Sequence, residues 1–137
     1  MLMAFSMFSI NTPTQSSPAN GSSNQNVNVT LWLNTVSGAT HYDYMLDTLS
    51  TFDSPALREF THTNSYSGWT PNDLYYGKTH YWKIRARNAT ETSDWSDTWS
   101  FTTKYLGAIQ SSPSNGSVDR GVSLTLSITK YGSRNYD

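Results

Sequence analysis

The sequence predicts an all-β protein, a two-sheet antiparallel β-sandwich of about seven strands. Apolar residues recur with a period of two along most of the chain, which is the period of a strand with one buried face. Turn-forming residues separate these runs at the spacing of a sandwich or barrel. The composition agrees, since 14% of the residues are aromatic and only 14% are charged, which suits strands with solvated faces.

The first half of the chain contributes two clear strands. Apolar and polar residues alternate over 26–33, and again over 42–47 after a turn at 37–40. The stretch 48–64 is expected to be irregular, because Pro55 interrupts it and no alternation continues through it.

The second half contributes the remaining strands. A short strand is expected to end at Leu74, before a turn at Gly77. Over 81–87 the apolar residues alternate with basic ones, so the basic side chains share the outer face of that strand. A last strand is expected from Trp95 to Phe101, with its later aromatic residues in the core.

One segment of the chain occurs twice. Residues 15–22 (QSSPANGS) return as 110–117 (QSSPSNGS), 95 residues later, and a fixed offset marks tandem modules. We therefore expect a complete module over 12–104 and the first strands of a second, truncated module over 105–137. Residues 1–11 are apolar without a basic start, and are expected to be either a leader or the last strand of a preceding module.

Two neighbouring segments carry a family resemblance. Residues 81–88 (YWKIRARN), followed by 93–103 (SDWSDTWSFTT), resemble the last two strands of bacterial fibronectin type III modules, and 37–42 and 52–55 add to the match. The resemblance covers about 12–103. It implies the sandwich fold and an extracellular or cell-surface location in a bacterium. It implies little about function, because this fold hosts many roles.

Two positions depart from the family's pattern. Leu33 fills the place where the family usually has an inward Trp, and Trp32 is expected to point outward. His80 stands where the family has a corner Tyr, and an imidazole is also able to donate to a backbone carbonyl.

Enzymatic and nucleic-acid functions find no support in the sequence. The three histidines lack metal-ligand spacing, and no nucleophile or phosphate-loop motif is present, so we expect no catalysis, no metal and no cofactor. The net charge of −1 gives no footprint for nucleic acid, and the apolar start is too short for membrane insertion. We expect a structural or adhesive spacer, which binds neighbouring modules or other copies of the chain.

A carbohydrate-binding module is the first alternative function, since sugar rings stack on exposed aromatic side chains. The candidate residues for stacking on glycans are Trp32, Trp69, Tyr75, Tyr76 and Tyr81.

The last two predicted strands also suggest a stack of tryptophan and arginine side chains, a Trp/Arg ladder. Trp95 and Trp99 stand in a Trp-Ser-x-x-Trp-Ser run, similar to the Trp-Ser box of cytokine receptors with one residue added. The expected ladder stacks Arg85 or Arg87 on Trp95.

A filament subunit that exchanges its terminal strands is the second alternative function, because the partial second module would expose one apolar face. The residues of this possible assembly strand are Val122, Leu124, Leu126 and Ile128. Thr48, in Asp-Thr-Leu, resembles a bacterial O-glycosylation acceptor.

Overall fold

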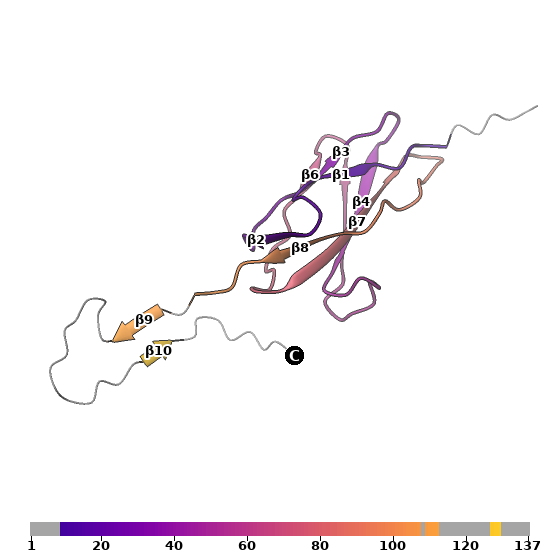
Figure 1. Ribbon diagram of the computed structural model, residues 1–137. Coiled ribbons are helices and arrows are strands. Elements are labelled where there is room, and N and C mark those ends of the chain that lie inside the picture. The colour runs from indigo at the N-terminus through magenta and orange to yellow at the C-terminus, as the bar shows by residue number, and fades with distance from the viewer. Residues whose placement is uncertain (1–8, 108, 113–126, 130–137) are drawn as a thin grey trace, which may run out of the picture. The chain divides into compact units, whose positions relative to one another are not determined.

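The computed structural model describes residues 9–107, 109–112 and 127–129. The contacts within the chain divide it into two units, Met1–Lys104 and Tyr105–Asp137. The described residues contain strands and turns and no helix, as expected for an all-β chain (Figure 1).

The described part of the first unit contains eight strands in two sheets. Their bounds are β1 Thr14–Ser17, β2 Ser22–Gln25, β3 Leu31–Asn34, β4 His41–Asp47, β5 Arg58–Thr63, β6 Gly68–Trp69, β7 Thr79–Arg87 and β8 Trp99–Thr103. The three-stranded sheet has the order β1-β3-β6, and the five-stranded sheet has the order β2-β8-β7-β4-β5 (Figure 1). This confirms the predicted two-sheet sandwich. One pair departs from the antiparallel prediction, because β2 runs parallel to β8.

The core lies between the two sheets and is centred on β4 and β7. Buried and half-buried residues alternate along β7, so Trp82, Ile84 and Ala86 point inward and are fully buried. The inward side chains of β4 meet them, and Tyr44 stacks parallel to Trp82 with ring centroids 6.3 Å apart. The other buried apolar residues are Ile10, Leu31, Leu33, Ala39, Tyr42, Leu46, Leu74 and Phe101.

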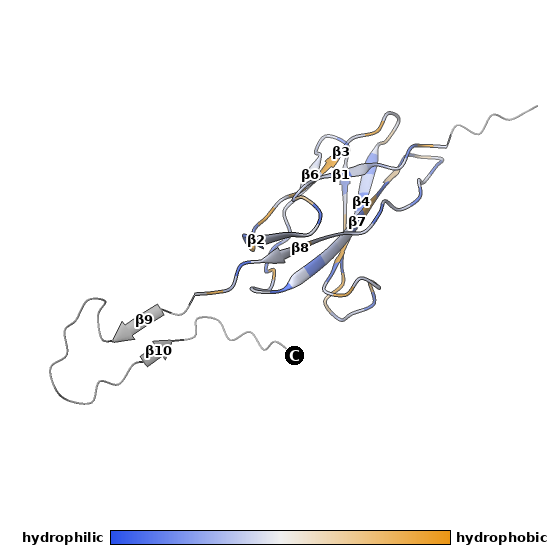
Figure 2. Cartoon of the chain, in the orientation of Figure 1, coloured by the Kyte–Doolittle hydropathy of each residue, from blue (hydrophilic) through white to orange (hydrophobic). Residues whose placement is uncertain are grey.

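Polar and apolar residues alternate along most of β4 and β7, the central strands of the five-stranded sheet (Figure 2). Since successive side chains of a strand point to opposite faces, this alternation leaves a polar outer face on the five-stranded sheet. The outer face of β7 carries Tyr81 and the basic residues Lys83, Arg85 and Arg87, which are all half-buried.

Several strands begin or end where the sequence did not predict it. The last strand, expected from Trp95 to Phe101, spans Trp99–Thr103. The strand predicted over 26–33 is shorter, since β3 starts at Leu31. Val27 and Val29 still pack against the core, but the amide of Val29 donates to the carbonyl of Asn26 in a turn. Leu74 is buried in a loop and ends no strand.

The stretch predicted to be irregular contains β5. Pro55 lies in a turn that is closed by a hydrogen bond from the Leu57 amide to the Ser54 carbonyl. This turn ends before β5 begins at Arg58, so the proline does not interrupt the strand. β5 is the edge of its sheet and pairs only with β4. Its side chains are mostly exposed, which is why it has no clear apolar alternation.

The chain enters and leaves the first unit at opposite ends of the sandwich. At the entry end, Thr14 at the start of β1 pairs with Asn34 at the end of β3. β4 starts at this same end, where His41 pairs with Arg87 at the end of β7. The last residues of β8 lie beside the start of β7, where Thr102 pairs with Thr79. β7 has nine residues and spans roughly 30 Å at about 3.3 Å per residue. Figure 1 shows both ends.

The second unit contains a strand pair that repeats the pairing of β1 with β3. β9 (Ile109–Ser112) and β10 (Ser127–Thr129) are antiparallel, with Gln110 opposite Ile128. In the first unit Gln15 is opposite Leu33, and both partners lie 95 positions earlier. Both pairs also shift register at the same point. Three residues of the predicted assembly strand, Val122, Leu124 and Leu126, lie outside the described residues, and Ile128 belongs to β10.

Candidate functional site

A cluster of charged residues occupies the outer face of the five-stranded sheet. The register places Asp43 of β4 between Arg85 of β7 and Thr61 of β5. Arg87, two residues further along β7, lies on the same face. The cluster therefore results from the strand pairing, which brings together residues that are 42 positions apart in sequence.

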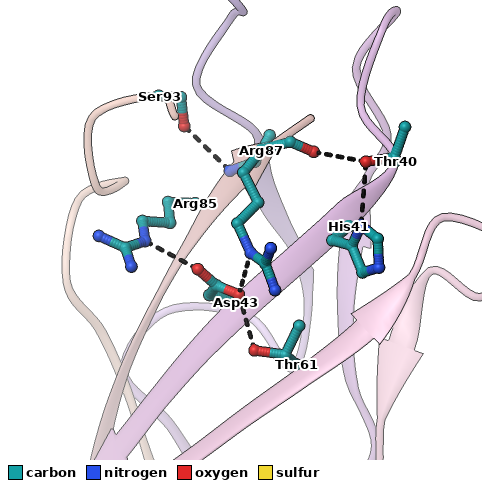
Figure 3. A network of polar contacts seen from close by, with 8 residues as sticks. Thr40, His41, Asp43, Thr61, Arg85, Arg87 and Ser93 are labelled. Carbon is teal, nitrogen blue, oxygen red and sulfur yellow. Dashed lines mark hydrogen bonds and ion pairs between the residues drawn. The ribbon is translucent and has the colours of Figure 1, made fainter. Parts of the chain in front are cut away.

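Asp43 holds both arginines in place. Its Oδ2 accepts a hydrogen bond from Arg85 Nε at 2.9 Å, and its Oδ1 accepts one from Arg87 Nε at 3.0 Å. The Thr61 hydroxyl donates to Oδ1 at 2.7 Å. Figure 3 shows the carboxylate between the two guanidinium groups. Burial works to raise the pKa of Asp43, but the bonds from Thr61, Arg87 and Arg85 outweigh it and lower the pKa.

Trp95 lies against the same cluster. The guanidinium carbon of Arg85 is 4.5 Å from the centroid of the Trp95 ring, and Lys83 Nζ is 5.2 Å from it. Lys83 Nζ is also 4.3 Å from the ring centroid of Phe52. Each such contact contributes about 0.5–1 kcal/mol at an exposed site. Both arginines of the predicted ladder bind Asp43, and Arg85 is the one that also stacks on Trp95.

Two serines fix the segment that carries Trp95. The hydroxyl of Ser93 accepts from the Ala86 amide at 2.9 Å, and that of Ser96 accepts from the Ile84 amide at 3.0 Å. The amides of both serines donate back to the carbonyls of the same two β7 residues at 2.8 Å. Residues 93–96 therefore follow the edge of β7 without being a regular strand, and Trp95 is held over the basic side chains.

The cluster surrounds a shallow hollow of about 320 Å³ between β5 and β7. Asp43, Arg85, Arg87 and Trp95 are among the residues that line it. Thr61 and Glu59 of β5 also line it, and Glu59 is exposed. The side chains of Arg85 and Arg87 keep 36% and 37% of their surface accessible, so a molecule in solution is able to reach them.

The aromatic residues predicted to stack on glycans do not form one platform. Trp32 is 45% exposed on the outer face of the three-stranded sheet, where its ring covers Gly68. Tyr81 lies on the outer face of the other sheet. Trp69 turns inward and stacks on Phe60 with centroids 5.1 Å apart, which covers the sandwich edge between β5 and β6.

Tyr75 and Tyr76 are half-buried in the loop before β7, at the end where β8 finishes. The carbonyl of Tyr75 accepts a hydrogen bond from the buried Thr103 hydroxyl. Tyr75 therefore takes part in the loop's own structure, away from Trp32 and Tyr81.

Thr48 lies in a tight turn after β4. Its amide donates to Asp47 Oδ1 at 2.6 Å, and Asp47 also accepts bonds from the amide and hydroxyl of Ser54. Burial works to raise the pKa of Asp47, but these hydrogen bonds outweigh it and lower the pKa. Thr48 is half-buried, and its hydroxyl is 3.4 Å from that of Ser54.

Asp43, Glu59 and Thr61 are members of the cluster that sequence reasoning did not single out. Along β4, Asp43 points to the other face of the strand from the two buried tyrosines that flank it, and this alternation was visible in the sequence. The two β5 residues carried no such signal, because their strand was not predicted.

Neither a metal centre nor a membrane-spanning helix is found among the described residues. They contain no group of three or more His, Cys, Asp and Glu side chains placed to hold a metal ion. None of them belongs to a helix long and apolar enough to cross a membrane.

Comparison with known proteins gives a likeness at the level of structure. No protein-family model matches the chain, and no curated protein sequence matches it. Among solved structures, the chain is similar to the crystal structure of chicken CNTN1 FN1-FN3 domains, with 17% identity and a TM-score of 0.49. The match covers 72% of this chain and 36% of the chicken chain, so this protein spans about a third of the length of the chicken chain. In the strand order of its two sheets, the first unit is a fibronectin type III-like β-sandwich.

Proposed function

We propose that the first unit is a non-catalytic spacer module of an extracellular protein built from tandem repeats, in which it binds the modules before and after it. One observation carries this proposal. The pairing of β9 with β10 repeats the register of β1 with β3, including its shift, at the 95-residue offset of the repeated sequence. A second fold unit thus starts as the first one does.

The path of the chain supports a role as spacer. The chain enters and leaves the sandwich at opposite ends, and this path within one module suits a spacer, in which each copy adds length. At the entry end, Ile10 is buried in the core, so this residue, which precedes β1, is part of the sandwich. The fold by itself hosts many roles, so the proposal rests on the repeated strand pairing and on the path of the chain.

The length of a repeat array tests this function. Chains with one, two and three copies of residues 10–104 would be compared by small-angle X-ray scattering. A spacer adds a constant step of roughly 30 Å or more to the maximum dimension with each copy, the length of β7 setting the minimum. A flexible Gly/Ser insert between copies serves as the control and broadens the distribution of lengths.

A maximum dimension that stays constant as copies are added would contradict the spacer role, since the modules would then pack side by side. Antibody labelling of intact source cells tests the extracellular location separately, and labelling that requires permeabilised cells would refute it.

A further inference from the structure

We propose that the hollow on the outer face of the five-stranded sheet binds a carboxylate-bearing sugar of the uronic acid class. The site uses Arg85 and Arg87 to hold the carboxylate, and Thr61 and Glu59 to bind sugar hydroxyl groups. This binding site is independent of the spacer role, because it lies on the face of one module and not at its ends.

The arginines are placed to receive an anion. Each uses its Nε to bind Asp43, and among the described residues the terminal Nη groups of both have no protein hydrogen bond. A guanidinium carries five N–H donors in a planar fork, so the Nη groups keep donors for a ligand. Arg85 is also held by the face of Trp95, which restricts its plane before a ligand arrives.

The charge of the cluster favours a carboxylate. Asp43 is the one carboxylate bonded to two guanidinium groups, so one positive charge remains uncompensated within this network. The oxygens of Asp43 already accept three hydrogen bonds, from Thr61 and both arginines. A ligand carboxylate would therefore add to the arginines and need not displace Asp43. Paired N–H donors of arginine match the two oxygens of a carboxylate.

The rest of the hollow favours a sugar with a single negative charge. Its volume of about 320 Å³ is at the lower end of the range for small-molecule sites, roughly 300–1,000 Å³, and suits a ligand of one or two rings. The Thr61 hydroxyl and the exposed Glu59 carboxylate are acceptors for ligand hydroxyl groups. Glu59 also repels further negative charge, which disfavours a polyacidic peptide.

Binding of three probes to the full chain tests the proposal. Galacturonic acid, neutral galactose and triglutamate would be titrated by NMR, with the side-chain N–H signals of Arg85, Arg87 and Trp95 as the readout. We expect galacturonic acid, which has one ring and one carboxylate, to bind, to shift these signals and to bind more weakly at high salt. Equal affinity for galactose would overturn the carboxylate contact. Equal affinity for triglutamate would replace the sugar site with a general anion site.

Variants separate a defined site from diffuse charge. Arg87→Lys keeps the charge but loses the fork, and we expect uronate affinity to fall by about tenfold or more, as for loss of a charged hydrogen bond. Lys104→Gln removes an exposed positive charge outside the hollow and should leave affinity unchanged. An equal loss in both variants would refute the site.

Glu59→Gln provides a test that does not depend on the arginines, since Glu59 is exposed and forms no ion pair among the described residues. We expect this variant to bind triglutamate more tightly relative to galacturonic acid than the unchanged chain does. An unchanged ratio would show that Glu59 does not select the ligand and would overturn its role. Thermal unfolding of each variant confirms that the fold is kept.

Discussion

His80 is buried without charge at the start of β7, and this makes the stability of the sandwich depend on pH. The residue is 3% exposed, and its ring stacks on Phe101 with centroids 5.3 Å apart. Nδ1 lies 3.1 Å from the carbonyl oxygen of Lys78, and Nε2 has no partner among the described residues. Burial lowers the pKa of His80 to about 4. The hydrogen bond with the Lys78 carbonyl works in the other direction, whereas the side-chain charges of Arg58 and Lys78 lower the pKa further.

The size and the direction of the effect follow from the two pKa values. The pKa is 6.5 in the unfolded chain and about 4 in the folded one, so the unfolded chain takes up the proton first as the pH falls. Stability is therefore full above pH 6.5, decreases between pH 6.5 and about 4, and changes no further below that through this group. A difference of about 2.5 pKa units corresponds to roughly 3 kcal/mol at about 1.4 kcal/mol per unit.

Urea unfolding at a series of pH values between about 7.5 and 4 measures this loss. We expect His80→Phe to remove most of the decrease, because phenylalanine keeps the stack on Phe101 and does not titrate. His41→Phe is the matched control on an outward, half-buried position of β4 and should keep the decrease. The pKa values of Asp43 and Asp47 are lowered, so their contributions are lost at pH values below that window. If His80→Phe and the unchanged chain lose the same free energy, the imidazole is not buried neutral and the reasoning fails.

Three substitutions in the sandwich test its structure by denaturant or thermal unfolding. Gly68→Ala places a Cβ 2.7 Å from Trp32 Cε3, so we expect a loss of about 1–3 kcal/mol. Trp32→Ala in the same chain should restore part of it, and a neutral Gly68→Ala would contradict the close approach. Thr103→Val removes the hydroxyl that bonds the carbonyls of Tyr75 and Lys78, and should cost about 1–3 kcal/mol; a variant as stable as the original would count against these bonds. Ile84→Ala should cost about 2–5 kcal/mol because Ile84 is fully buried, and a loss below about 1 kcal/mol would be inconsistent with a close-packed centre.

The fold could be predicted because alternation is a local property of the sequence. Trp82, Ile84 and Ala86 were expected inward and are buried, and Trp32 was expected outward and is exposed. β5 was missed because an edge strand with one neighbour needs little apolar alternation. Its position depends on pairing with β4, which the residues of β5 alone do not reveal.

The candidate site was harder to predict because it depends on register and on sheet order. Asp43 meets Arg85 only because β4 and β7 are neighbours in one particular register. Trp32 and Tyr81 each have the outward phase that the sequence predicted, but they belong to different sheets and so face opposite ways. The face of a strand on which a side chain lies follows from the local sequence, whereas the sheet to which that strand belongs depends on the topology of the whole module.

The parallel pairing of β2 with β8 determines how the module responds to mechanical tension. β8 is the last strand of the unit and β2 is near its start, and the pair is joined by bonds such as those from the Gly21 amide to Ser100 and from the Lys104 amide to Gln25. Since the chain enters and leaves at opposite ends, a pull on both ends slides these two strands past each other. Their hydrogen bonds are then loaded together in shear and not broken one after another. Resistance to force depends on the rate of unfolding, so this contact gives the module mechanical strength that equilibrium stability does not measure.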